Sequence, residues 1–316
     1  MYNILLCIDD FQWDYTRHCA VTVLSLLETN KNHKIKIFIM SSNLSGENIN
    51  ELKRIVKLYN QEIEFIIHDT LIPDEIKESV INRRNLTWGT WYRLFFPLYI
   101  NNIDRLLYID CDVIITKDIS EIYCMDMKQK AIAWYYDIET TKYVKKQYFW
   151  IDDYINAGVL LIDAKKYDFK KINIYNIKNI NNLYWEWIDD SDQDYLNLIF
   201  KDDILIYNNK MNYLVERPFF NKWISKASIL HCLAKPYIQY SDCPKDICEL
   251  YYKYLNQTKR KDFKPQKRPV LWYLYNVFYR IAFLFLKYLF WLKTAVRYSK
   301  FHKNILTKVL NITKKK

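Results

Sequence analysis

Two carboxylates interrupt an otherwise apolar run in the sequence, LLYIDCDVII at residues 106–115. Asp110 and Asp112 lie one residue apart, and burying two unpaired carboxylates is strongly unfavourable. They therefore need either solvent at the end of a strand or a cation. Carboxylates are the hard oxygen ligands that manganese and magnesium prefer, so a DxD triplet suits a divalent ion that itself holds a diphosphate. The alternative is a pair of solvated acids at a strand end, because such triplets often arise by chance.

The pattern around these acids alternates between strand and helix. Strands are predicted at residues 3–8, 34–40, 63–67, 131–136, 157–162 and 228–232, and helices at 19–27, 45–59 and 192–200. This alternation predicts an α/β fold with a largely parallel sheet and right-handed crossovers. Ligands of such sheets collect at the carboxyl ends of strands, which is where Asp9, Asp10, Asp110 and Asp112 fall.

Four further segments accompany the DxD triplet. They are TWGTWYRLFFPLYI (87–100), YINAGVLLID (154–163), DQDYLN (192–197) and ILHCLAKPY (229–237). In this order and spacing they resemble glycosyltransferase family 8, the retaining nucleotide-sugar transferases that include bacterial lipopolysaccharide galactosyl- and glucosyltransferases. The resemblance covers residues 3–238. It implies a GT-A, Rossmann-like fold: a mixed, mostly parallel sheet flanked by helices.

The resemblance also implies a metal and diphosphate site. Asp110 and Asp112 match the DxD of the family, and His231 matches the histidine that binds Mn²⁺ (or Mg²⁺) with it. Lys235, before Pro236, is similar to the lysine that grips the diphosphate. Neutral imidazole is a good manganese ligand beside two carboxylates.

Other matched residues are expected to hold the UDP-sugar donor. Asp9 and Tyr15 are similar to the acid and the aromatic residue that bind uracil, and Asp10 adjoins them. The residues expected around the donor sugar are Arg93, Asp137, Asn156, Asp192 and Gln193, of which Asp192 and Gln193 are the catalytic candidates. The Gln193 carbonyl would stabilise an oxocarbenium-like anomeric carbon.

Each assignment has a structural alternative. His231 is otherwise an ordinary histidine packed at a strand end, and Arg93 is otherwise the partner of a local acid. Asp192 is otherwise a helix N-cap. The segment Asn156-Ala-Gly is otherwise a turn into a strand, with Gly158 there for close approach. Tyr15 is one of 28 tyrosines, so chance placement is a rival explanation.

The sequence departs from the family pattern at two places. The stretch DDFQWDY inserts residues between Asp10 and Tyr15, so Phe11 or Trp13 is an alternative stacking partner for uracil. The late motif HCLAKP is shorter than usual and lacks its glycine, which bears on the reach of Lys235 toward phosphate.

Basic residues are concentrated at the C-terminal end. The net charge is +11, but from Lys259 onward 16 Lys and Arg accompany a single acid, Asp262, whereas the preceding residues carry more acids than bases. Charge and two prolines mark a break at residues 259–269. We therefore expect a GT-A catalytic domain at residues 1–258, a basic linker at 259–269 and an appended tail at 270–316.

The predicted tail opens with an aromatic and aliphatic stretch, residues 270–296. Arg280, Lys287 and Lys293 interrupt it, which argues against a membrane span. At helical spacing its polar residues form one narrow stripe, so we expect an amphipathic helix at the cytosolic face of a membrane, aided by flanking bases. The alternative is a helix packed on the catalytic domain. Nucleic-acid binding is not expected, because it would not explain the contiguous apolar surface.

Seven cysteines without a CxxC pair indicate a reducing compartment, and the N-terminus lacks the pattern of a signal peptide. We expect a cytoplasmic, peripheral membrane enzyme of the inner leaflet. Its expected activity is hexose transfer, of galactose or glucose, from a UDP-sugar to a lipid-linked or cell-surface glycan, as in lipopolysaccharide biosynthesis. The alternatives are a metal-dependent nucleotidyl- or phosphotransferase and a catalytically decayed nucleotide-sugar-binding protein.

Overall fold

The structure is a computed structural model that describes residues 1–10, 15–83, 87–135, 148–151, 153–207, 212–214, 227–232 and 245–264, and, further on, residues 270, 271, 274, 277, 278 and 281. The chain separates into two compact units. The first is Met1–Ile238 with Cys243–Phe263, and the second is Gln239–Asp242 with Lys264–Lys316. The first unit holds the candidate site. The division into catalytic domain, linker and tail at the expected boundaries stays a prediction.

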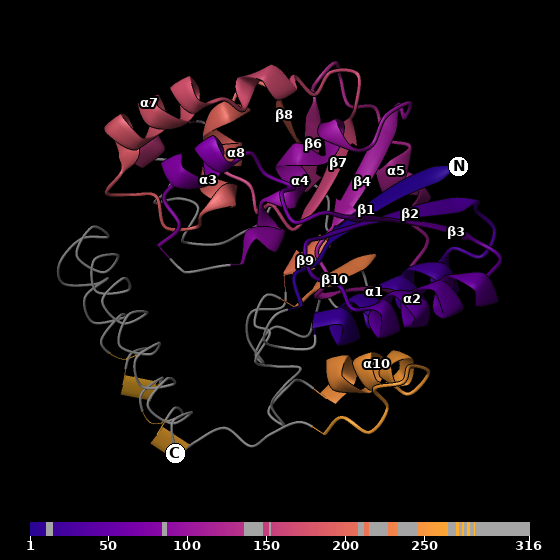
Figure 1. Cartoon of the computed structure of the whole chain (residues 1–316). Coiled ribbons are helices and arrows are strands. Elements are labelled where there is room, and N and C mark those ends of the chain that lie inside the picture. Colours follow the sequence, from indigo (N-terminus) through magenta and orange to yellow (C-terminus); the bar gives the residue numbers. More distant parts are fainter. Residues whose placement is uncertain are drawn as a thin grey trace. The chain divides into compact units, whose positions relative to one another are not determined.

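A seven-stranded sheet forms the centre of the first unit (Figure 1). Its strands, in spatial order, are β3 (Glu62–Ile67), β2 (Ile35–Ser41), β1 (Tyr2–Cys7), β4 (Arg105–Ile109), β7 (Val159–Asp163), β6 (Ile132–Tyr135) and β8 (Ile204–Tyr207). Only the pairs that involve β7 are antiparallel. The expected mixed, mostly parallel sheet is therefore confirmed.

A second, three-stranded sheet was not predicted from the sequence. It consists of β5 (Val113–Ile115), β10 (Ile229–His231) and β9 (Asn212–Leu214), in the order β5-β10-β9. The run at residues 106–115 therefore crosses from one sheet to the other: β4 ends just before Asp110, and β5 begins just after Asp112. Because β10 pairs antiparallel with β5, His231 lies opposite Val113.

Helices flank the large sheet on both sides (Figure 1). On one side α1 (Tyr15–Thr29) contacts α2 (Gly46–Leu58) and α10 (Lys245–Leu255). The remaining helical segments are α3 (Asp74–Ser79), α4 (Tyr92–Phe95), α5 (Ser120–Tyr123), α7 (Ile174–Tyr184), α8 (Asp192–Ile199) and the short 3-10 turns Trp88–Thr90, Phe96–Leu98 and Phe169–Lys171. Ser45 caps α2 by accepting a hydrogen bond from the Asn48 N–H, as its sequence position predicts.

The core surrounds the central strand β1. The side chains of Ile4, Leu5 and Leu6 are fully buried, because a central parallel strand is covered by helices on both faces. Burial on both faces explains why the sequence of β1 is a continuous apolar run. The polar residues that follow the strand lie at the carboxyl ends of the parallel strands. Among the residues that the structure describes, no helix is both long enough and apolar enough to span a membrane.

Candidate active site

Three ligand-type side chains converge between the two sheets: Asp110 after β4, Asp112 before β5, and His231 at the end of β10. Nε2 of His231 lies 3.3 Å from Oδ1 of Asp112 and 3.6 Å from Oδ2 of Asp110. One ligand atom from each residue lies within 4.8 Å of the other two. The Cys232 N–H donates to the Asp112 carbonyl at 2.9 Å, which continues the β5–β10 pairing and holds the histidine beside the acids. We call these three residues the metal triad.

The chemistry of the triad fits a divalent cation. His231 is fully buried, and neither of its ring nitrogens has a hydrogen-bond partner among the described residues. A buried polar atom left without a partner costs free energy, so such an atom calls for an explanation. A cation bound by Nε2 and the two carboxylates would satisfy all three groups, and this mixture of oxygen and imidazole ligands suits Mn²⁺.

Gly158 adjoins the triad and leaves no space for a side chain. A Cβ atom at this position would lie 2.1 Å from Cε1 of His231 and 2.6 Å from Oδ2 of Asp110. The Gly158 carbonyl also accepts a hydrogen bond from the Asp110 N–H at 2.7 Å. Gly158 is therefore needed because His231 and Asp110 approach its backbone closely. This agrees with the structural reading of the Asn156-Ala-Gly segment, and the close approach involves two members of the metal triad.

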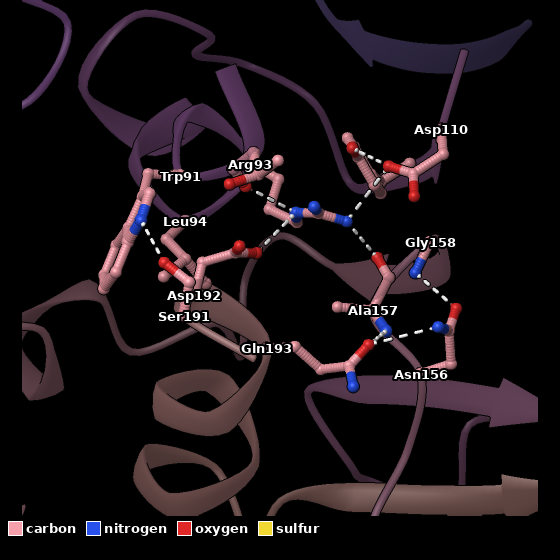
Figure 2. Close-up of polar contacts among 12 residues, drawn as sticks. Trp91, Arg93, Leu94, Asp110, Asn156, Ala157, Gly158, Ser191, Asp192 and Gln193 are labelled. Atoms are coloured by element: carbon pink, nitrogen blue, oxygen red, sulfur yellow. Dashed lines mark hydrogen bonds and ion pairs between the residues drawn. The ribbon is translucent and has the colours of Figure 1, made fainter. Parts of the chain in front are cut away.

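Arg93 connects the triad to the start of α8 (Figure 2). Its guanidinium lies 3.1 Å from Oδ1 of Asp110 and 3.0 Å from Oδ2 of Asp192. It also donates to the carbonyls of Thr90 and Ala157. Arg93 thus pairs with acids from two distant segments instead of a local one. The Tyr108 hydroxyl donates to the same Asp110 carboxylate, so the orientation of this candidate metal ligand is held by two side chains.

Burial changes the proton affinities around Arg93. It raises the pKa of Asp192 to about 6, although the Arg93 charge acts in the opposite direction. Burial alone would lower the pKa of Arg93, but Asp192, Tyr108 and Asp110 outweigh it and hold that pKa above its ordinary value. Arg93 is therefore a permanent cation, whereas Asp192 is ionised at neutral pH and takes up a proton in mild acid.

Gln193 and Asn156 bind the start of α8 to the turn before β7. Oε1 of Gln193 accepts hydrogen bonds from Nδ2 of Asn156 at 3.1 Å and from the Ala157 N–H at 3.0 Å. Ser191 occupies the N-cap position with a φ of 52°, so Asp192 is the first residue of the helix and not its N-cap. Figure 2 shows Asp192 turned toward Arg93 and Gln193 toward the turn.

The predicted uracil-binding residues lie after β1 and at the start of α1. Burial raises the pKa of Asp9, whose carboxylate accepts from the Gly89 N–H; a Cβ at Gly89 would lie 2.8 Å from Cβ of Asp9. The Asp10 carboxylate accepts from the backbone of Tyr15 and from the side chains of Thr16 and Asn48, so it stabilises the start of α1. Burial raises the pKa of Tyr15, and the charge of Asp112 adds to this effect.

Four candidate residues lie outside the described part of the chain: Phe11, Trp13, Asp137 and Lys235. The choice of uracil-stacking residue and the reach of Lys235 toward phosphate therefore stay predictions. Conversely, sequence reasoning assigned no role to Tyr108, Tyr154 or Asp194. Tyr108 interrupts the apolar run at 106–109, whereas Tyr154 and Asp194 lie within the motifs YINAGVLLID and DQDYLN.

A family model for glycosyl transferase family 8 matches residues 3–235, so the chain belongs to that family. It is therefore a retaining glycosyltransferase with a candidate metal site. It is 24% identical to general stress protein A of Bacillus subtilis over 81% of this chain and 94% of that protein. It is 24% identical to lipopolysaccharide 1,2-glucosyltransferase of Escherichia coli over 70% of this chain and 66% of that protein.

Solved structures confirm the GT-A fold. The galactosyltransferase LgtC, in complex with donor and acceptor sugar analogues, superposes with a TM-score of 0.67 at 19% identity and covers 86% of this chain and 99% of that one. The glycosyltransferase GlyE of Streptococcus pneumoniae superposes with a TM-score of 0.54 at 20% identity, covering 85% and 67%.

Gly158→Ala should weaken metal binding, because the added methyl group displaces His231 and Asp110. We expect Mn²⁺ affinity to fall about tenfold or more, the usual cost of disturbing the support of metal ligands. Titration calorimetry with Mn²⁺, with and without UDP, measures it. Gly46→Ala is the matched control, since nothing lies within 4 Å of its added Cβ. Equal Mn²⁺ affinity in the two variants would contradict the assigned triad.

The raised pKa of Asp192 predicts a pH-dependent stability. A proton binds this carboxyl more readily in the folded chain than in the unfolded chain, so its contribution to the unfolding free energy is full below about pH 4 and is lost as the pH rises through about 6. Between these limits we expect the difference in unfolding free energy between Asp192→Asn and wild type to shift by about 1–3 kcal/mol in favour of the variant. Urea unfolding of both proteins from pH 4 to 8 measures this shift; a pH-independent difference would refute it.

Proposed function

We propose that this protein transfers a hexose, galactose or glucose, from a UDP-sugar to a lipid-linked or cell-surface glycan, and that Mn²⁺ or Mg²⁺ is required. The convergence of Asp110, Asp112 and His231 carries this proposal, because it unites the ligands that a nucleotide diphosphate site needs. The names of two relatives support the choice of sugar: one is a lipopolysaccharide 1,2-glucosyltransferase and the other a galactosyltransferase.

The chemistry of the transfer matches the charges of the site. A divalent ion held by the triad would neutralise charge that grows on the leaving diphosphate. Arg93 keeps Asp110 oriented for that ion and keeps Asp192 fixed near the expected sugar position. Lys235 is proposed to bind the diphosphate. The departing phosphate oxygen then takes the proton of the acceptor hydroxyl on the same face of the sugar, so no flanking pair of carboxylates of the glycosidase kind is needed.

Two other activities use similar residues. A nucleotidyl- or phosphotransferase also binds a divalent ion with adjacent carboxylates, and a decayed enzyme would bind the nucleotide sugar without turnover. The matched family argues against the first, and the intact geometry around His231 argues against the second. The products separate all three, because only a glycosyltransferase releases UDP together with a glycosylated acceptor.

Asp112→Asn should abolish most metal-dependent turnover. We expect the rate of UDP release from UDP-glucose or UDP-galactose to fall at least about a hundredfold, because a charged ligand of the metal is lost. UDP release and mass spectrometry of the products measure it, in a screen of both donors with Mn²⁺. Asp163→Asn is the control: the contacts of the Asp163 carboxylate among the described residues are with the N–H groups of Lys165 and Lys166, in the turn after β7, and with the Lys166 ammonium. Full manganese-dependent turnover by Asp112→Asn would refute the proposal.

We also propose that the tail at residues 270–316 attaches the enzyme to the inner leaflet of a membrane. The described residues Val270, Leu271, Leu274, Val277, Phe278 and Ile281 are helical and each more than half exposed. They recur every three or four positions, which supports one exposed apolar face. Exposed apolar faces of this kind, followed by many bases, favour anionic bilayers.

Phe278→Glu should weaken attachment of the full-length protein to vesicles. A carboxylate on the apolar face opposes insertion and is repelled by anionic lipid, so binding to phosphatidylglycerol-containing vesicles should drop about tenfold. Sedimentation with vesicles at rising salt measures it. Leu58→Glu, at an exposed leucine of α2 in the first unit, is the control. If both variants bind as wild type does, the tail is not the attachment site.

A further inference from the structure

The carboxamide of Gln193 is held at both ends. Its oxygen accepts from Nδ2 of Asn156 and from the Ala157 N–H, at 3.1 and 3.0 Å, and its nitrogen donates to the Tyr154 hydroxyl at 3.0 Å. The Ala157 N–H can only donate, so it identifies the oxygen end of the amide independently of the other contacts.

The hydrogen bond at the nitrogen end is itself directed by a buried carboxylate. The Tyr154 hydroxyl donates to Oδ1 of Asp194 at 2.5 Å, and Oδ2 of Asp194 accepts from the N–H groups of Asp189 and Asp190 at 2.7 and 2.8 Å. Tyr154 has a single proton, which Asp194 accepts, so its oxygen is left to accept from Gln193. Burial and the neighbouring acids raise the pKa of Tyr154, so this proton stays in place.

We propose that Tyr154 and Asp194 are positioning residues that fix which end of the Gln193 amide faces the sugar-binding side of the turn before β7. The inference rests on the proposed function, in which Gln193 contacts the donor sugar. Tyr154 and Asp194 themselves are buried and act through the amide.

The orientation matters because the two ends of an amide are alike in size and opposite in polarity. The oxygen end lies against a turn that is tied to the metal triad: Arg93 donates to the Ala157 carbonyl, and the Asp110 N–H donates to the Gly158 carbonyl. Reversing the amide would set its NH₂ group against the Ala157 N–H and its oxygen against a hydroxyl whose proton is already donated. An oxygen held toward a positively charged anomeric carbon lowers the barrier, whereas an NH₂ group in its place raises it.

Tyr154→Phe tests the first link. The ring is kept and only the acceptor for the Gln193 amide is removed, so we expect kcat for sugar transfer to fall about tenfold while KM for the donor changes less than about twofold. Tyr123→Phe is the matched control. The buried Tyr123 hydroxyl also accepts from one N–H, that of Asn3, and donates to one oxygen, the Arg105 carbonyl. Both contacts lie at the amino-terminal ends of β1 and β4, whereas the candidate site lies at their carboxyl ends. A merely structural loss would affect both variants alike.

Asp194→Asn, alone and combined with Tyr154→Phe, tests whether the two residues act through one amide. An asparagine that donates to the Tyr154 oxygen turns the phenolic proton toward Gln193, so we expect a kcat loss at least as large as that of Tyr154→Phe. Because both substitutions release the same group, the double variant should lose little more than the larger single loss. Losses that multiply would overturn the proposal.

Crystal structures give a reading that does not depend on turnover. In the wild type and Tyr123→Phe the Gln193 carboxamide should keep its position between the Ala157 N–H and residue 154; in Tyr154→Phe its nitrogen has lost the acceptor, so the carboxamide should rotate away from that position. An unmoved Gln193 in Tyr154→Phe would overturn the inference. A wild type that neither transfers nor hydrolyses a UDP-sugar would instead overturn the proposed function, and the crystallographic reading would still decide the positioning.

Discussion

The site depends on the pairing of β10 with β5. This short antiparallel pair sets a fully buried imidazole, His231, against two carboxylates that the chain supplies as it passes from the large sheet to the small one. Neither ring nitrogen finds a hydrogen bond among the described residues, so the arrangement is costly without a cation and favourable with one. If the candidate site binds a cation, metal affinity and the β5–β10 pairing would therefore be linked, because each would stabilise the other.

Arg93 extends this link to the side where the donor sugar is proposed to bind. It is nearly completely buried, and its position depends on the acids Asp110 and Asp192 at its two ends. Removal of either acid would leave a buried cation short of counter-charge, which is usually costly. The same guanidinium also binds the Ala157 carbonyl, next to the N–H that orients Gln193. Asp110, Asp192 and the Gln193 amide are therefore positioned by one connected set of contacts.

The sequence predicted the strands β1, β2 and β7, which are largely apolar runs, and the helix α2, which has a Ser cap, but it did not predict α7, α10 or β8. It also predicted that Asp110, Asp112 and His231 meet, but only through the resemblance of motifs in order. The physical cause is a second sheet of three-residue strands; the sequence predicted one of them, at residues 228–232, but not its pairing with β5, because strands so short leave no periodic pattern from which a partner could be assigned. Tyr154 and Asp194 were missed for a related reason: their roles arise from hydrogen bonds between segments about 40 residues apart, and polar residues within a motif do not reveal their partners.

The charges of the site explain why a further basic residue is needed. Among the described residues the triad and its neighbours carry three carboxylates, from Asp110, Asp112 and Asp192, against one guanidinium, so two negative charges are in excess when His231 is neutral. A divalent cation balances them. A diphosphate then adds negative charge that no cation in this set of residues offsets, and its burial would be unfavourable without another partner. Lys235 is the first basic residue after His231 in the sequence, four positions on. The excess negative charge therefore gives its predicted role at the diphosphate a physical reason beyond the motif.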